Sequence, residues 1–189
     1  MNHLMIDLET MGTNPRAPIV SIGAVFFNPQ VGELGAEFYA TVSLSSALDQ
    51  GAIPEGDTII WWLKKSSEAR AAICIDDALH IAKALSELSS FISRNSDNPR
   101  DLKVWGNGAN FDNVILRSAY ERAGHVCPWK FWNDSDVRTM VLLGKQLGFD
   151  PKSDMSFDGV AHNALADARH QVKYVSAIWQ RLLPASTEE

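Results

Sequence analysis

Cysteine is scarce in this sequence. The 189 residues include only Cys74 and Cys127, and neither belongs to a C-x-x-C pair. Two isolated cysteines with no histidine cluster beside them indicate neither a disulfide framework nor a structural zinc site. We therefore expect two free thiols, buried in the core of a protein from a reducing cytoplasm.

Long apolar runs are also lacking. No uninterrupted run approaches the ~20 residues that a membrane-spanning helix needs. The N-terminus carries Asp7 and Glu9 and no basic segment, so it does not resemble a secretory signal peptide. The pattern predicts a cytoplasmic protein that does not associate with a membrane.

Positive charge is in the minority, with 17 Lys and Arg residues against 23 Asp and Glu residues and a formal net charge of -6. This balance argues against a broad basic surface that binds duplex nucleic acid unaided. It leaves a nucleic-acid substrate open, because cations bound to clustered acids would reverse the local charge where a phosphate approaches.

What remains is an ordinary globular composition, 46% hydrophobic and 21% charged. The length suits one sizeable core, and two domains would each be thin. We expect residues 1–189 to form a single domain.

The hydrophobic pattern predicts an α/β fold. Three β-rich segments, 4–9, 19–27 and 37–44, are separated by short polar connections and indicate an antiparallel meander. After a loop-like stretch at 45–57, helices are expected at 58–71 and from Asp76 to about Ser93, and strands then alternate with helices. The order predicts a mixed sheet of about five strands, three antiparallel and then two parallel, flanked by helices. The later elements are expected at 102–106, 113–124 (closed by Gly124), 131–136, 137–148 and 163–183.

Two acids end the first predicted strand, in the segment MIDLET. Because side chains alternate along a strand, Asp7 and Glu9 project from the same face, opposite Leu4, Ile6 and Leu8. Like charges at this spacing repel unless a positive group lies between them. A divalent cation is the simplest such group.

A third acid, Asp112, opens a predicted helix directly after the turn WGNGANFD. It is expected at the carboxyl end of a buried strand, where open α/β sheets bind ligands. An acid in the first turn of a helix is also favoured by the helix dipole alone, and this simpler interpretation stays open.

His162 and Asp167 are five residues apart, so two mid-helix positions would diverge by ~140° and could not share a target. If Asn163 caps the last helix, His162 lies on the loop before it and Asp167 is fixed in the first turns. This arrangement gives a rigid carboxylate for a metal and a mobile imidazole for proton transfer. A single histidine is also compatible with an ordinary surface position.

The segments DLET, ANFD and HNALADA resemble the three motifs of the DEDDh 3′–5′ exonucleases, a group of the ribonuclease H-like superfamily. IVSIGAV resembles the second strand of these enzymes. TIIWWLKKSSEAR and WGNGANFDNVIL resemble a small stand-alone subgroup that includes RNase AS and phage-type exonuclease VIII-like proteins. The sister DEDDy group would have a tyrosine where Asn163 stands.

The resemblance implies two-metal hydrolysis of a single strand from its 3′ end, with release of nucleoside 5′-monophosphates. Asp7, Glu9 and Asp167 would bind one metal ion, and Asp7 would bridge to a second that Asp112 approaches. His162 would act as the general base. Carboxylate ligands favour Mg²⁺ or Mn²⁺ over Zn²⁺.

Five residues are candidates for substrate contact: Thr10, Met11, Trp61, Trp62 and Phe111. Thr10 and Met11 resemble positions that hold the terminal ribose and wedge against the last base, although Met11 also suits core packing. The adjacent tryptophans suit base stacking or a core, and on a helix at most one faces fully inward. Phe111 either packs behind Asp112 or touches a base.

The nearby basic residues Lys64, Lys65 and Arg70 suit either phosphate contacts or a solvated helix face. Gly108 departs from the resemblance, because many relatives have Asn there, and this leaves local substrate contacts open.

RNA is the favoured substrate, and three alternatives remain. The first is a DNA-directed exonuclease, since nothing in the sequence reads a 2′-hydroxyl. The second is a dinucleotide-binding protein, because WGNGANF resembles part of G-x-G-x-x-G, although Phe111 stands at the third glycine. The third is a non-catalytic nucleic-acid-binding module of the same fold. A homodimer is expected only by resemblance.

Overall fold

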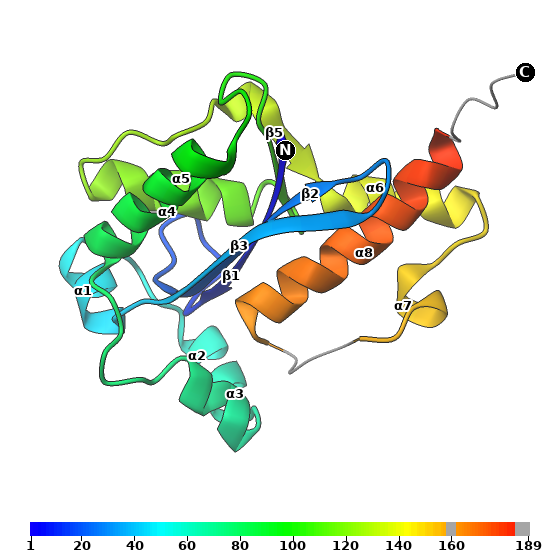
Figure 1. Ribbon diagram of the computed structural model, residues 1–189. Helices are drawn as coiled ribbons and strands as arrows, with labels where there is room; N and C mark the ends of the chain where they lie inside the picture. The colour runs from blue at the N-terminus through cyan, green and yellow to red at the C-terminus, as the bar shows by residue number, and fades with distance from the viewer. Residues whose placement is uncertain (158–161, 184–189) are drawn as a thin grey trace, which may run out of the picture.

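The computed structural model describes residues 1–157 and 162–183, and its centre is a five-stranded mixed sheet with helices on both faces (Figure 1). The strand order is β3-β2-β1-β4-β5. This confirms the predicted α/β fold with three antiparallel strands followed by two parallel ones. The strands are β1 (His3–Thr10), β2 (Ile19–Asn28), β3 (Glu33–Thr41), β4 (Lys103–Gly106) and β5 (Asp134–Asp136).

β1 is the central strand and sets the position of the first two acids. It pairs antiparallel with β2, where Asp7 lies opposite Gly23, and parallel with β4 on its other side. The register shifts between Glu9 and Thr10, where β1 ends. Because β1 and β4 run in parallel, their carboxyl ends meet at the same edge of the sheet.

Each face of the sheet is covered by a pair of helices (Figure 1). Leu4, Ile6 and Leu8 pack on one face with α4 and α5, whereas Met5 packs on the other face with α6 and α8. The predicted alternation along β1 is therefore confirmed. The helices are α4 (Ile81–Asn95), α5 (Asp112–Arg122), α6 (Val137–Gln146) and α8 (Ala164–Leu182).

Some helix boundaries differ from the sequence prediction, and local capping explains two of them. The expected loop at 45–57 contains a helix because the Ser43 side chain accepts a hydrogen bond from the backbone of Ser46. The expected single helix at 58–71 is divided because Ser66 caps a new helix. The short helices are α1 (Leu44–Asp49), α2 (Gly56–Leu63), α3 (Ser67–Ala72) and α7 (Pro151–Asp154).

The long helix begins at Ile81, five residues after the predicted start at Asp76. Leu79 is held in an extended conformation, because its N–H donates to the carbonyl of Thr41 and its carbonyl accepts from the N–H of Ser43. Tertiary pairing with the end of β3 thus overrides the helical spacing of the apolar residues.

The prediction of two buried thiols is wrong. Both cysteines are free, but Cys74 is exposed just after α3 and Cys127 is half-buried. None of the helices in the described part of the chain has the length and apolar character that a membrane span requires.

The first turn of α8 crosses β2 very closely, and Gly23 permits this approach. A Cβ built on Gly23 would lie 2.3 Å from the carbonyl carbon of Ala164. Gly23→Ala is therefore expected to lower the free energy of unfolding by about 1–3 kcal/mol, because the helix start must move. Urea unfolding at equilibrium measures this loss. Gly56→Ala is the matched control, since nothing lies within 4 Å of its Cβ position; equal stability of both variants would contradict the close approach.

Candidate active site

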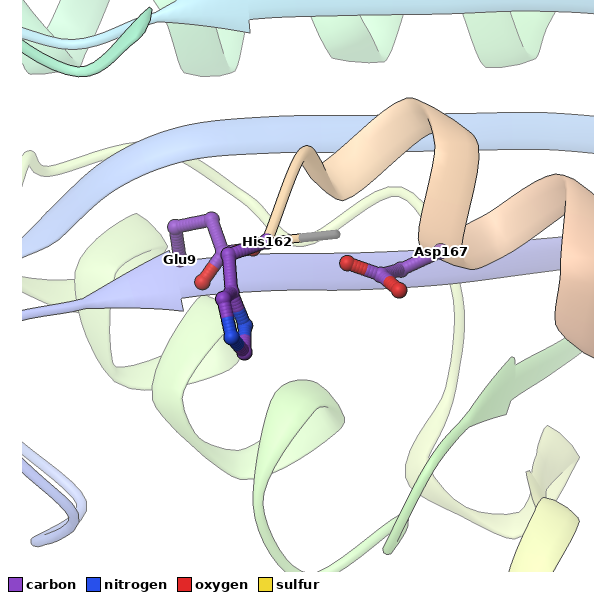
Figure 2. A group of neighbouring side chains, drawn as sticks. All are labelled: Glu9, His162 and Asp167. Carbon is purple, nitrogen blue, oxygen red and sulfur yellow. The ribbon is translucent and has the colours of Figure 1, made fainter. Parts of the chain in front are cut away.

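Three of the predicted site residues converge at the end of β1. Glu9 comes from β1, Asp167 from α8, and His162 from the residue before the helix cap (Figure 2). One ligand atom from each of these side chains lies within 4.8 Å of the other two. The Asn163 side chain accepts a hydrogen bond from the N–H of Ala166, which confirms the predicted cap.

The other two acids complete the cluster from β1 and α5. Oδ1 of Asp112, which is only 2% exposed, accepts a hydrogen bond of 3.2 Å from the backbone N–H of Leu8. Oδ1 of Asp7 accepts one of 2.6 Å from Nε2 of Gln171. The structure thus brings together carboxylates from segments that lie more than 150 residues apart in the chain, such as Glu9 and Asp167.

All four carboxyl groups have a raised pKa. Burial is the first cause for Asp7, whose pKa lies well above its usual range, and the charges of Asp112, Glu9 and Asp167 add to it. Burial and the charges of Asp167 and Asp112 raise the pKa of Glu9 to about 8. Burial raises the pKa of Asp112 to about 7 and that of Asp167 to about 6. In the described part of the chain, no ion pair joins these groups to a lysine or arginine.

A second glycine fixes the place of Asp112. A Cβ on Gly106, the last residue of β4, would lie 2.4 Å from Oδ1 of Asn113 and 2.9 Å from Cβ of Asp112. Nδ2 of Asn113 donates to the carbonyl of Val104 at 2.9 Å. The start of α5 is therefore packed tightly against the end of β4, which directs Asp112 toward β1.

The imidazole of His162 packs against the tryptophan pair. Its ring centroid is 4.8 Å from that of Trp61 and 6.2 Å from that of Trp62, both edge-to-face. His162 has a φ of 65°, in the left-handed region that few non-glycine residues adopt. Partial burial lowers its pKa, and the charge of Lys65 lowers it further. The ring is therefore neutral near pH 7 and can accept a proton.

A cavity of about 390 Å³ opens beside Glu9, and four of the five predicted substrate residues line it: Thr10, Trp61, Trp62 and Phe111. The two tryptophans differ as predicted, since Trp62 is buried and Trp61 is 41% exposed. Met11 does not line the cavity; it is buried in a cluster with Val20, Trp62, Ala69 and Ile73.

The predicted basic residues have different surroundings. Nζ of Lys65 lies 3.7 Å from the ring centroid of Trp61 and acts on the pKa of both Glu9 and His162, so it faces the site. The Arg70 guanidinium donates to the carbonyl oxygens of Leu63 and Lys65, which joins α2 to α3.

Gln171 was missed by the sequence analysis. It is 4% exposed and lies four residues, about one helical turn, after Asp167 on α8. A polar side chain in the buried stripe of a helix, one turn beyond a candidate ligand, is the signal that would have found it. Its hydrogen bond holds the Asp7 carboxylate in one orientation.

Two solved nuclease structures have a fold similar to that of this chain. The nuclease domain of 3′hExo, a DEDDh family member solved with rAMP, has a TM-score of 0.58 and 14% identity, over 95% of this chain and 91% of that one. The zinc-bound complex of E. coli exonuclease I with single-stranded DNA has a TM-score of 0.67 and 16% identity. This second match covers 97% of this chain and 41% of exonuclease I. The shared fold is that of the ribonuclease H-like nucleases, as predicted.

The chain belongs to the family of Rv2179c-like 3′–5′ exoribonuclease domains, whose sequence model matches residues 2–179. It is also 27% identical over 216 aligned positions to the exodeoxyribonuclease of Enterobacteria phage T4, covering 100% of this chain and 95% of that protein. The family defines a hydrolytic 3′–5′ exonuclease, and the structural neighbour 3′hExo is a member of the DEDDh family. The predicted family and enzyme class are confirmed.

Proposed function

We propose that this protein removes nucleoside 5′-monophosphates from the 3′ end of single-stranded nucleic acid, preferably RNA, with two divalent cations. The observation that carries the proposal is the cluster of four carboxylates from three elements, which have raised pKa values and form no ion pair with a described lysine or arginine. Such a cluster is stable in its charged form only when cations bind to it.

The donor set fits two hard ions. Asp7, Glu9 and Asp167 would hold one, and Asp7 and Asp112 the other, all through carboxylate oxygens. Oxygen ligands select Mg²⁺ or Mn²⁺. When bound, such ions supply a nucleophile at neutral pH and neutralise charge on the leaving 3′ oxygen.

In this proposal, His162 would act as the general base. Its neutral imidazole lies with Glu9 and Asp167 and can take the proton of the attacking water. Trp61 packs against the ring, and partial burial and the charge of Lys65 both favour the neutral form of the imidazole. The contact means that Trp61 supports the base as well as the substrate cavity.

The 390 Å³ cavity would receive the terminal nucleoside. Its lining has aromatic rings and hydroxyl groups but no lysine or arginine, which suits an uncharged base and sugar. Trp61 and Phe111 would stack on the base, and Thr10 lies where the ribose would enter. The buried Met11 would act by supporting Trp62 from behind.

RNA is preferred over DNA in this proposal because the family is described as exoribonuclease and 3′hExo was solved with rAMP. The phage T4 relative is an exodeoxyribonuclease, and this supports the alternative that the substrate is DNA.

Matched 5′-labelled RNA and DNA strands of one sequence would test the proposal, with Mg²⁺, Mn²⁺ or a chelator. The expected result is a ladder that shortens from the 3′ end, faster on RNA and absent with the chelator. A faster ladder on DNA would establish the alternative substrate. Binding of either strand without metal-dependent shortening would support a non-catalytic module instead.

Substitutions of Trp61 and Trp62 are expected to have separable effects, one on KM and the other on stability. Trp62 is 3% exposed and its Nε1 donates to the carbonyl of Thr10 at 2.9 Å, so Trp62→Ala should lower the free energy of unfolding by about 3–5 kcal/mol. Trp61→Ala should cost much less stability but raise KM for the strand about tenfold, because a stacking surface worth about 1–3 kcal/mol is lost. Chemical unfolding and steady-state kinetics measure the two. Similar stability losses in both variants would contradict the assigned orientations.

A further inference from the structure

A second cavity, of about 520 Å³, lies between α6, α7 and the middle of α8. Arg138, Lys145 and Lys152 line it together with Asn107 and Tyr174. Its lining residues, all within the described ranges, include no aspartate or glutamate. Three cations therefore face one cavity in a protein whose formal net charge is -6.

This cavity borders the acid cluster. Tyr174 follows Asp167 by seven residues, about two turns of α8, and the charges of Asp7, Asp167 and Asp112 all reach its hydroxyl. Arg138, which lines the cavity from α6, also acts through its charge on the pKa of Asp112. The 390 Å³ cavity beside Glu9, here called the nucleoside cavity, and this second one, called the basic cavity, share none of their lining residues. Glu9 itself lines the nucleoside cavity, whereas Tyr174 and Arg138 of the basic cavity interact electrostatically with the acids.

Two of the three cations are available to a ligand. Lys145 pairs with Asp150 at 2.9 Å, so its charge is partly compensated. Among the described residues, no carboxylate lies within ion-pair distance of Arg138 or Lys152. Both side chains belong to exposed residues at the cavity wall.

The absence of a side chain at Gly108 leaves room for the guanidinium of Arg138. This glycine has a φ of +103°, and a Cβ there would lie 3.1 Å from Cζ of Arg138. A side chain at this position would crowd the guanidinium, and few residues other than glycine adopt this φ. The Arg138 guanidinium therefore lies close to the backbone at Gly108, and its charge acts on Asp112.

The two cavities differ in the part of a nucleotide that they suit. The first has Glu9 and Asp57 in its lining and no cation, so it repels phosphate and suits a nucleoside. The second has cations and no acid, and guanidinium and ammonium groups bind phosphate oxygens well. A strand whose scissile phosphate lies at the acids has its remaining phosphates on the 5′ side.

We propose that the basic cavity binds the backbone phosphates on the 5′ side of the scissile bond, chiefly through Arg138 and Lys152. The inference rests on the proposed exonuclease function. It assigns a strand-binding subsite at which one or two nucleotides before the scissile bond are held.

The test compares a 12-nucleotide strand with thymidine 5′-monophosphate p-nitrophenyl ester, which has no nucleotide on the 5′ side. In Arg138→Gln/Lys152→Gln, the ratio of KM for the strand to KM for the ester should rise about tenfold. The dependence of log Kd on log salt for the strand, measured by anisotropy in an Asp7→Asn background, should become shallower by about 1.4, or ~0.7 per phosphate contact. The matched control is Lys83→Gln/Arg94→Gln on α4, across the sheet.

An unchanged KM ratio and salt slope in the double variant, with an active wild type, would overturn this inference alone. Equal losses on strand and ester would also overturn it, because the residues would then act on the chemistry. If the double variant fails to fold, Lys152→Gln carries the test with an expected slope change of about 0.7. A wild type that hydrolyses neither substrate would instead refute the proposed function.

Discussion

Replacing Asp7 with Asn is expected to lower turnover by about 10³-fold or more on single-stranded RNA in Mg²⁺. Asp7 is the one acid whose pKa is raised by all three of the other carboxylates, so it lies at the centre of the cluster. Loss of its charge removes the group that would serve both cations. The measurement is single-turnover hydrolysis of a 5′-labelled strand at saturating metal.

The same variant should be more stable than the wild type when metal is absent. An Asn keeps an oxygen for Nε2 of Gln171 and presents an amide N–H to the neighbouring carboxylates. Thermal unfolding in a chelator at pH 8 should therefore give a higher Tm for Asp7→Asn. A lower Tm would show that Asp7 is there to support the fold and not to bind cations.

The pH dependence of the metal-free wild type follows from the same pKa shifts. A carboxyl group whose folded pKa is raised adds stability that is fully present below its ordinary pKa, about 4. That stability is lost as the pH rises through the folded value, which for Glu9 is about 8. Metal-free protein should lose stability from pH 5 to 8, and Mg²⁺ should restore more of it at pH 8 than at pH 6. Asp7→Asn should flatten the loss.

His162→Asn is expected to lower kcat by about 10²- to 10⁴-fold while metal and strand binding remain. Asn tolerates the left-handed φ of 65° at this position but cannot take a proton near neutral pH. His162→Ala should lose as much turnover, with a small additional loss of stability from the backbone conformation. Rapid-quench kinetics and anisotropy separate turnover from binding.

His125→Ala provides the control for the histidine, since it removes an imidazole from outside the site at the end of α5. Its kcat should match the wild type. Unchanged turnover in both His162 variants would refute the role of this residue as the base.

Much of the fold was predictable because the apolar residues of most helices and strands recur at a single spacing. The alternation in β1 places Leu4, Ile6 and Leu8 in one core and Met5 in the other, so the shared face of Asp7 and Glu9 follows from it. The order of the elements then fixed the mixed sheet, since parallel pairing of β1 and β4 requires a crossover between them.

The errors arose where a single hydrogen bond or contact decides the structure. Ser43 and Ser66 each start a helix through one side-chain bond, and nothing in the apolar pattern marks them. Cys74 is exposed just after the end of α3, a boundary that the apolar pattern does not mark either.

The convergence of the candidate acids was predictable from the sequence, but the contacts that hold them in position were not. Local patterns mark Asp112 and Asp167 as candidates, yet the bond from Gln171 to Asp7 joins residues 164 apart in sequence. The close approaches at Gly23 and Gly106 also become visible only when the helices are placed. Packing of Trp61 on His162 joins two motifs that the sequence analysis treated separately.

The central claim is that these acids hold two divalent cations, and counting bound Mn²⁺ tests it most directly. Electron paramagnetic resonance titration with Mn²⁺, in the presence of a nucleoside 5′-monophosphate, should give two ions bound per wild-type chain. Asp7→Asn should bind neither tightly while keeping its fold. Wild-type protein that binds no Mn²⁺, or an Asp7→Asn variant that binds two ions as tightly as the wild type, would contradict the account.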